Sequence, residues 1–170
     1  MIPAVLDAAK ARPGTLARLR NIFYGAAPIQ EPILRRLMLE APGVGLSQMY
    51  GQSELGGACT LLPPERHVLE GPLSGKTRSA GRAMSAFSLR VVDESGQPCP
   101  AGVSGEIQVS GPGLMTSYWR DPAMTAAAIQ DGWLRTGDIG VLDDEGFVSI
   151  VGRLKDMIIS GGENVYSTEV

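Results

Sequence analysis

Hydrophobic and polar positions in the first part of the chain follow two different periods. Leu19 to Tyr24 and Val44 to Tyr50 have the pattern of strands, and Glu31 to Ala41 between them has the 3.6-residue period of an amphipathic helix. A strand, a helix and a strand in this order predict a crossover unit with parallel strands. Ligands of such sheets bind at the carboxyl ends of the strands, where Gly25-Ala26-Ala27-Pro28 and Gly51-Gln52-Ser53-Glu54 lie.

The pattern changes after a loop rich in proline, glycine and charge at Pro63 to Ala80. Short β-rich runs separated by turns then predict a small antiparallel barrel or sandwich, and they are Ser88 to Val92, Gly105 to Ser110, Asp138 to Leu142 and Phe147 to Val151. A helix is predicted from Pro122 to about Ile129, with Asp121 as its N-cap.

Two further elements are predicted near the ends of the chain. Met1 to Lys10 has helix-like apolar spacing. Met157 to Ile159 is an apolar, strand-like run, and the turn Ser160 to Asn164 follows it.

The composition is that of a folded domain, and its charge does not indicate a nucleic acid partner. The 170 residues are 44% hydrophobic and 19% charged, and a net charge of -3 excludes a general attraction to nucleic acid or anionic lipid. No run approaches the roughly 20 apolar residues of a membrane span, and no signal peptide is evident. We therefore expect a cytoplasmic protein, in which Cys59 and Cys99 are reduced thiols.

Candidate chemistry begins at Tyr50 to Glu54. A tyrosine ring can stack on a purine, the hydroxyl of Ser53 can bind a phosphate oxygen, and the carboxylate of Glu54 can hold the cation that accompanies ATP. A β-turn with a capping serine explains the pentapeptide equally well.

Two later segments carry groups that suit a ribose. In Thr136-Gly137-Asp138 the carboxylate at the start of a strand can accept hydrogen bonds from both ribose hydroxyls, and Arg153 in Gly152-Arg153 can donate to ribose or phosphate oxygens. Each segment alone is equally typical of a solvated turn.

The order of these segments along the chain favours a functional interpretation over isolated turns. Together with Ser160 to Asn164, they resemble the adenylate-forming superfamily of AMP-binding enzymes, which includes acyl-CoA synthetases, luciferases and peptide-synthetase adenylation domains. Connecting segments such as Tyr118-Trp119 and Asp131-Gly132-Trp133 also resemble that family, so the similarity covers essentially the whole chain. Gly161 to Tyr166 is most similar to bacterial fatty-acyl and aryl-acid CoA ligases.

The resemblance implies a two-step reaction, in which a carboxylic acid and ATP give acyl-AMP and a thiol of CoA then displaces AMP, with Mg²⁺ as the metal. It implies that Ser53, Glu54 and Lys155 take part in catalysis: Ser53 contacts the α-phosphate, Glu54 holds Mg²⁺, and Lys155 is the hinge of a small C-terminal domain. The implied ATP and AMP contacts are Gly25, Ala26, Ala27, Gln48, Tyr50, Gly51, Ser53, Asp138 and Arg153, and the implied CoA contacts are Gly161 and Gly162.

Pattern and resemblance together predict an α/β fold. Residues 1–80 would be the end of a parallel-sheet nucleotide-binding domain, residues 81–152 a β-barrel subdomain, and residues 153–170 the hinge and first strand of a C-terminal α+β domain.

The sequence also departs from the family. Ile159 stands where a lysine is common, and Ser117 stands where a glycine is common. A Ser/Thr/Gly-rich phosphate loop with its lysine does not occur, and the family's late lysine would fall beyond Val170. We therefore expect an internal piece of a ligase that is inactive alone. A non-catalytic nucleotide-binding remnant and a β-rich interaction module are the alternatives.

The remaining candidates for function are a histidine, two tryptophans and an acidic run. We expect His67 to be a solvated surface residue, because a catalytic base needs an orienting partner. Trp119 and Trp133 are expected to pack inside the barrel, and Asp143 to Glu145 to form a solvated turn.

Overall fold

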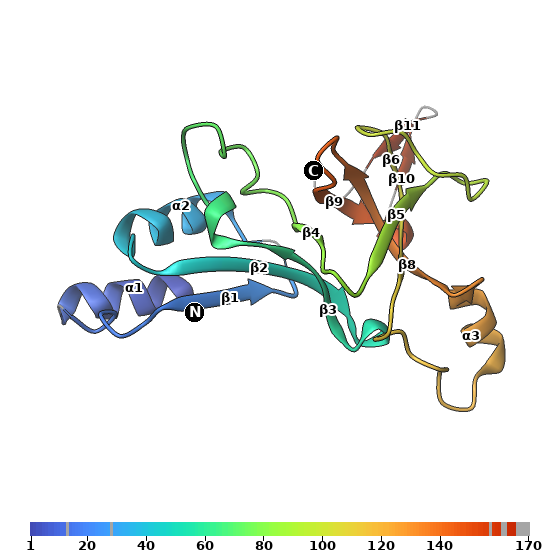
Figure 1. Cartoon of the computed structure of the whole chain (residues 1–170), viewed down its shortest axis with the longest axis horizontal. Helices are drawn as coiled ribbons and strands as arrows, with labels where there is room; N and C mark the ends of the chain where they lie inside the picture. The colour runs from blue at the N-terminus through green and yellow to red at the C-terminus, as the bar shows by residue number, and fades with distance from the viewer. Residues whose placement is uncertain (13, 28, 157, 161–162, 166–170) are drawn as a thin grey trace.

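The fold is mixed α/β and is built on two sheets (Figure 1). It is taken from a computed structural model of the chain, in which residues 1–12, 14–27, 29–156, 158–160 and 163–165 are described. The two sheets meet at the carboxyl ends of the first strands, and this junction positions the site.

The first sheet has the order β1-β2-β3-β4. Strands β1 (Asn21–Gly25) and β2 (Gly45–Gln52) are parallel and are connected by α2 (Glu31–Glu40), so the predicted crossover unit is confirmed. Strands β3 (Gly57–Leu62) and β4 (Arg82–Ala83) run antiparallel, which makes the sheet mixed rather than parallel throughout.

Strand β3 was not predicted from the sequence. A reversal of the chain at two glycines precedes it. The 3₁₀ helix η1 (Ser53–Leu55) ends at Gly56, which has a φ of 71°, and Gly57 follows with a φ of 119°. These backbone conformations favour glycine, and they turn the chain back along β2.

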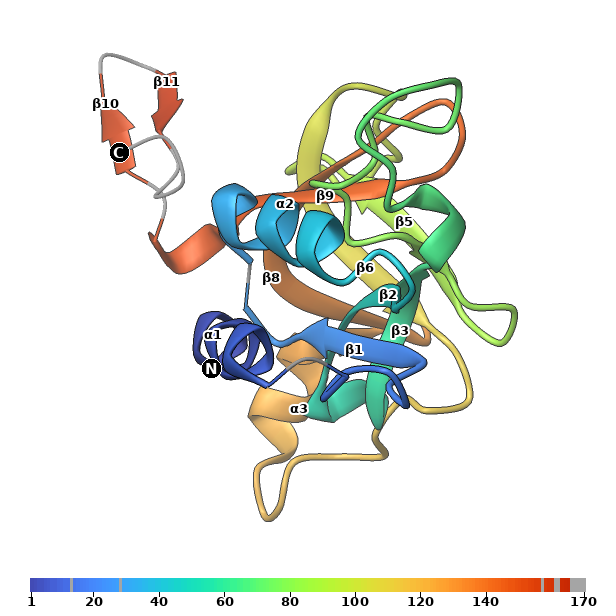
Figure 2. The same cartoon turned by 90° about the vertical axis from the view of Figure 1, so that its left-hand side faces the viewer.

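The helices α1 (Ile2–Ala11) and α2 lie together at the β1–β2 end of the first sheet (Figure 2). They share an apolar core with β2, to which α1 contributes Leu6, α2 contributes Leu34 and Leu37, and β2 contributes Leu46. Ion pairs join the same helices: Lys10 lies 2.9 Å from Glu40, and Arg36 pairs with Asp7.

The second sheet is antiparallel, open and curled into half a barrel. Its order is β5-β6-β8-β7, with β9 paired to one end of β8; the strands are β5 (Ser88–Val92), β6 (Ser104–Ser110), β7 (Ile129–Gln130), β8 (Trp133–Leu142) and β9 (Val148–Arg153). Its inner residues, among them Ile107 and Val109, pack with Cys59 from β3 of the first sheet and with Leu55 from η1. The two sheets therefore share one core. Burial raises the pKa of the Cys59 thiol to about 11, which keeps it protonated.

The remaining elements are short. Helix α3 (Pro122–Ala128) begins as predicted, since Asp121 Oδ1 accepts a hydrogen bond of 2.8 Å from the Met124 amide. The 3₁₀ helices η2 (Pro64–Arg66) and η3 (Leu154–Asp156) follow β3 and β9. Strands β10 (Ile158–Ser160) and β11 (Glu163–Val165) form an antiparallel hairpin that projects from the two sheets in Figure 2.

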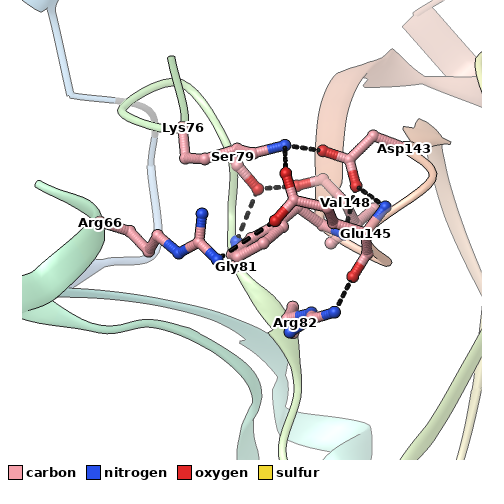
Figure 3. Close-up of polar contacts among 9 residues, drawn as sticks. Arg66, Lys76, Ser79, Gly81, Arg82, Asp143, Glu145 and Val148 are labelled. Carbon is pink, nitrogen blue, oxygen red and sulfur yellow. Dashed lines mark hydrogen bonds and ion pairs between the residues drawn. The ribbon is translucent and has the colours of Figure 1, made fainter. Parts of the chain in front are cut away.

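The segment between β3 and β4 ties the two sheets together (Figure 3). Lys76 pairs with Asp143 and lies 2.9 Å from Glu145, while the Val148 amide donates to the Gly81 carbonyl at 2.9 Å. Partial burial acts to raise the pKa of Asp143, but the hydrogen bond from Lys76 holds it below the usual value. The turn at Asp143 to Glu145 is exposed at Asp144 and Glu145, as expected, and it also pairs with Lys76.

The two tryptophans have different environments. Trp119 is 85% exposed, so the prediction that it packs inside the barrel is wrong. Trp133 is partly buried and lies under the Arg90 guanidinium, 4.1 Å from the ring centroid. Among the described residues, no helix has the length and hydropathy of a membrane span.

Candidate active site

An open cleft of about 1220 Å³ lies between the two sheets. The ends of β1 and β2, the turn after β2, the Thr136-Gly137 segment of β8 and the end of β9 line it. Four of the predicted segments therefore meet at one cavity, and they are Gly25-Ala26, Tyr50 to Glu54, Thr136-Gly137 and Arg153 to Lys155. The β1 and β2 ends lie there because parallel strands point their carboxyl ends to the same edge.

Asp138 is the buried centre of this arrangement, with a relative exposure of 4%. Its Oδ1 lies 3.0 Å from Arg153 Nε, and its Oδ2 accepts hydrogen bonds from Tyr50 Oη at 2.8 Å and from Gln52 Nε2 at 2.9 Å. A carboxylate offers about four lone-pair sites. A ligand hydroxyl can therefore add to Asp138 or replace Arg153, whose side chain is 55% exposed.

The hairpin of β8 and β9 explains the pairing of Asp138 with Arg153. The two residues are register partners in the ladder, so their side chains leave the sheet side by side. The sequence-based prediction that the hairpin brings them together is confirmed. Tyr50 and Gln52 reach the same carboxylate from β2, which is in the other sheet.

Tyr50 remains a neutral donor in this setting. Burial raises the pKa of its hydroxyl, and the charge of Asp138 raises it further. The side chain is held at its hydroxyl end, and the residue lines the cleft.

Ser53 and Glu54 begin the 3₁₀ helix η1 on the rim of the cleft. Ser53 is exposed. Glu54 Oε1 accepts a hydrogen bond of 2.8 Å from Tyr118 Oη, and the Glu54 carbonyl accepts one of 2.7 Å from the Met115 amide.

The rim fits Mg²⁺ better than it fits a metal held by protein alone. Across the described part of the chain, no group of three or more His, Cys, Asp or Glu residues is placed to hold an ion. Mg²⁺ commonly takes one or two carboxylates and completes its shell with water and substrate phosphates. Glu54 on this open cleft is compatible with that mode.

The predicted glycines owe their identity to strand packing. A Cβ on Gly25 would lie 2.1 Å from the Met49 carbonyl oxygen, and one on Gly51 would lie 1.9 Å from that of Gly57. Ala26, between β1 and the next segment, has a φ of 64°, an uncommon conformation for a residue with a side chain.

Three predicted contact residues do not line the cleft, and they are Ala27, Gln48 and the buried Asp138. Ala27 is exposed beyond its edge, and Gln48 lies half-buried on β2, where Tyr24 Oη is 3.4 Å from its Oε1. Lys155 lies on the rim in η3 and is exposed. Gly161 and Gly162 fall outside the described residues.

His67 differs most from its expected environment. It is 8% exposed, its Nδ1 lies 3.0 Å from the Pro63 carbonyl and its Nε2 lies 2.8 Å from Tyr24 Oη. A carbonyl only accepts, so Nδ1 carries a proton and, in the neutral ring, Nε2 accepts from Tyr24. Burial lowers the His67 pKa, which favours that neutral ring. The prediction of a solvated histidine is wrong.

Sequence reasoning did not assign roles to Gln52, Thr136, Tyr118 and Tyr24. Gln52 Nε2 joins the Thr136 carbonyl at 2.9 Å as well as Asp138. Gln52 stands inside the motif after Tyr50, and Tyr118 stands in a segment that resembles the family, so both lay next to a usable signal.

A buried carboxylate on β8 and an aromatic residue near the end of β2, beside an open cleft, define an α/β protein with a small-molecule site. Residues 1–119 match the family described as AMP-binding enzyme, and the chain belongs to that family.

Similar proteins agree with this assignment. The chain is 41% identical to the indoleacetate–CoA ligase of Aromatoleum aromaticum, over all of this chain and 32% of that protein. It is 38% identical to a feruloyl-CoA synthase of an Amycolatopsis species, over 99% of this chain and 34% of that protein. The chain thus spans about a third of the length of these relatives.

Solved structures agree as well. The O-succinylbenzoate coenzyme A synthetase of Bacillus subtilis in complex with AMP superposes with a TM-score of 0.85 and 34% identity. That match covers 99% of this chain and 33% of the other.

Proposed function

We propose that this chain carries the nucleotide-binding part of an AMP-forming acid:CoA ligase. The observation that supports it best is the convergence of Tyr50, Gln52 and Arg153 on the buried carboxylate of Asp138, beside an open cleft. The relatives are CoA ligases by name, which favours ligation over a non-catalytic role.

In this proposal each group acts on one part of ATP. The Tyr50 ring stacks on the base, beside the backbone of Gly25, Ala26 and Gly51. Asp138 accepts from the ribose hydroxyls, and Arg153 donates to the ribose oxygens. Of the remaining predicted contacts, the exposed Ala27 acts from beside the cleft, and Gln48 acts from its position on β2.

In this proposal the phosphates of ATP bind at the rim of the cleft. The Ser53 hydroxyl donates to an oxygen of the α-phosphate, and Glu54 holds Mg²⁺. When bound, Mg²⁺ would neutralise the negative charge that develops on the phosphate as the substrate carboxylate attacks. The acid, ATP and CoA are the proposed substrates, with no nucleic acid partner and a cytoplasmic location.

The second step belongs to the C-terminal residues. Residues 1–80, 81–152 and 153–170 would be the end of the nucleotide-binding domain, the β-barrel subdomain and the start of a C-terminal domain. Lys155 is then the hinge, and Gly161 and Gly162 line the path of the CoA pantetheine. The exposed position of Lys155, directly after β9, supports a hinge role.

The experiment that tests the nucleotide site is calorimetric titration of the chain with ATP and with AMP. Asp138→Asn should weaken both by about 1–3 kcal/mol, because a neutral amide replaces an ionised acceptor. Asp131→Asn is the matched control, since Asp131 is an exposed turn residue. Equal affinity of the two variants would contradict the proposal.

Turnover is tested separately. We expect the isolated chain to give no pyrophosphate exchange with fatty or aryl acids, because its sequence contains no Ser/Thr/Gly-rich loop with a lysine to stabilise the transferred phosphates. Exchange above background would contradict this expectation.

A further inference from the structure

Tyr118 contacts a proposed metal ligand from a distant part of the chain. It lies in the loop between β6 and α3, 64 residues after Glu54, and its hydroxyl is 2.8 Å from Glu54 Oε1. We propose that Tyr118 is a positioning residue for Glu54, which holds one carboxylate oxygen so that the other receives the divalent cation of a bound nucleotide. This inference rests on the proposed function of the cleft.

The direction of the hydrogen bond follows from the chemistry of the two groups. An ionised carboxylate only accepts, so Tyr118 donates to Oε1. Partial burial raises the pKa of Tyr118, and the hydrogen bond to Glu54 raises it further, so the phenol keeps its proton. Within the described chain, Glu54 Oε2 makes no hydrogen bond or ion pair, and Glu54 lines the cleft. That oxygen is the one left for a cation.

Tyr118 is itself held in place by α3. Its amide donates to Thr125 Oγ1 at 3.0 Å, and the Thr125 hydroxyl donates to the Asp121 carbonyl at 2.7 Å. The support therefore runs from the capped first turn of a helix to the phenol and from the phenol to the carboxylate.

The same loop also fixes the backbone of Glu54. The Met115 amide donates to the Glu54 carbonyl at 2.7 Å, and a Cβ on Gly113 would lie 2.2 Å from the Leu55 carbonyl oxygen. The loop and the rim are thus in direct backbone contact. With its main chain and one carboxylate oxygen both held, Glu54 loses less side-chain freedom when a cation binds.

Positioning and simple structural support predict different results. If Tyr118 positions Glu54 for a metal, Tyr118→Phe affects the affinity that depends on the metal and leaves metal-free AMP binding as it is. If Tyr118 only supports the loop, the variant weakens ATP and AMP binding together or changes neither.

The experiment measures ATP affinity of the purified chain by calorimetry at a series of Mg²⁺ concentrations, and AMP affinity without metal. For Tyr118→Phe we expect a rise of about three- to tenfold in the Mg²⁺ concentration that gives half of the maximal increase in ATP affinity. This is the factor that the lost preorganisation of one side chain produces. AMP affinity should stay within experimental error. Ser117→Ala, which removes an exposed hydroxyl from the same loop, is the matched control and should behave like the wild type.

A second variant keeps the test decisive. In a Glu54→Gln background the Mg²⁺ dependence should be weak, and adding Tyr118→Phe should change it no further, since Tyr118 acts through Glu54. The inference is overturned if Tyr118→Phe leaves the Mg²⁺ dependence unchanged, shifts it downward, or has its full effect without Glu54. If the wild-type chain binds no ATP at all, the proposed nucleotide site and this inference both fail. If the wild type and Tyr118→Phe both bind ATP normally and with the same Mg²⁺ dependence, the inference about Tyr118 fails and the proposed nucleotide site stands.

Discussion

Asp138 and Arg153 face each other across the β8–β9 hairpin, and their side chains meet at 3.0 Å between Oδ1 and Nε. Asp138 lies in the middle of β8, and Arg153 is the last residue of β9. Because Tyr50 and Gln52 bind the other oxygen, the carboxylate is oriented before any ligand arrives. Preorganisation of this kind lowers the cost of binding.

The pair should act as one clamp on the ribose. We expect Asp138→Asn and Arg153→Ala each to weaken AMP binding by about 1–3 kcal/mol and to be non-additive in the double variant. The wild type should prefer AMP over 2′,3′-dideoxy-AMP, and both variants should lose that preference. Calorimetry measures the affinity of each protein for each nucleotide. Arg78→Ala, at an 86% exposed side chain, is the control, and an unchanged preference in Asp138→Asn would count against the clamp.

A hinge at Lys155 predicts a selective kinetic effect. In a protein that contains this chain and the remaining length of its relatives, Lys155→Pro should slow thioester formation more than adenylate formation. Proline restricts φ and thereby limits the rotation that the second step needs. Single-turnover measurement of each half-reaction tests this, with Lys155→Ala as the flexible control. Equal losses in both half-reactions would contradict a hinge.

His67 should make the stability of the chain depend on pH. Its pKa is lowered from the usual 6.5 by burial, so the unfolded chain takes up a proton at a higher pH than the folded chain does. Stability is therefore complete above about pH 6.5 and falls as the pH drops below that value. The single histidine gives one ring C2 proton signal, whose NMR titration should report a pKa below 6.5.

Urea unfolding at pH 7.5 and at pH 5.5 measures the same effect. The wild type should lose more stability between these conditions than His67→Gln, which keeps an acceptor for Tyr24 but does not titrate. A wild-type difference no larger than that of the variant would show that His67 is not the titrating group.

Gly51 should be required for the packing of β2 against β3. An added methyl group would lie 1.9 Å from the Gly57 carbonyl oxygen and 2.8 Å from the Ala58 Cα, so one of the strands must shift. We expect Gly51→Ala to destabilise the chain by about 1–3 kcal/mol in urea unfolding. Gly43→Ala is the matched control, because its new methyl group would meet no atom within 4 Å. Similar midpoints for the two variants would refute the packing role.

Local sequence patterns predicted the second sheet well. Strand β5 has the predicted bounds, and β6 begins one residue earlier than predicted, because alternation along an antiparallel edge is visible within five residues. The β8–β9 hairpin was predicted from its Asp-Asp-Glu-Gly turn, and with it the pairing of Asp138 and Arg153. Strand β8 is longer than predicted, since Trp133 to Gly137 lacks clear alternation.

The parts that could not be predicted depend on contacts between distant segments. Tyr118 reaches Glu54 across 64 residues, and His67 reaches Tyr24 across 43. Nothing in the local sequence of either residue indicates its partner. The same reason explains why His67 was expected on the surface, since its contact with Tyr24 comes from β1, which is distant in sequence.

The contacts of Lys76 with Asp143 and Glu145 (Figure 3) also predict how the protein would behave after a cut between β3 and β4. The exposed stretch between Glu70 and Leu73 is a suitable point for a protease, since both flanks are fixed while the stretch itself faces solvent. The piece ending there keeps β3, and the piece beginning there keeps β4, Lys76 and the whole second sheet. Shared strand pairing and a shared core should hold the pieces together, so a nicked chain would run as one species in gel filtration and as two bands after denaturation.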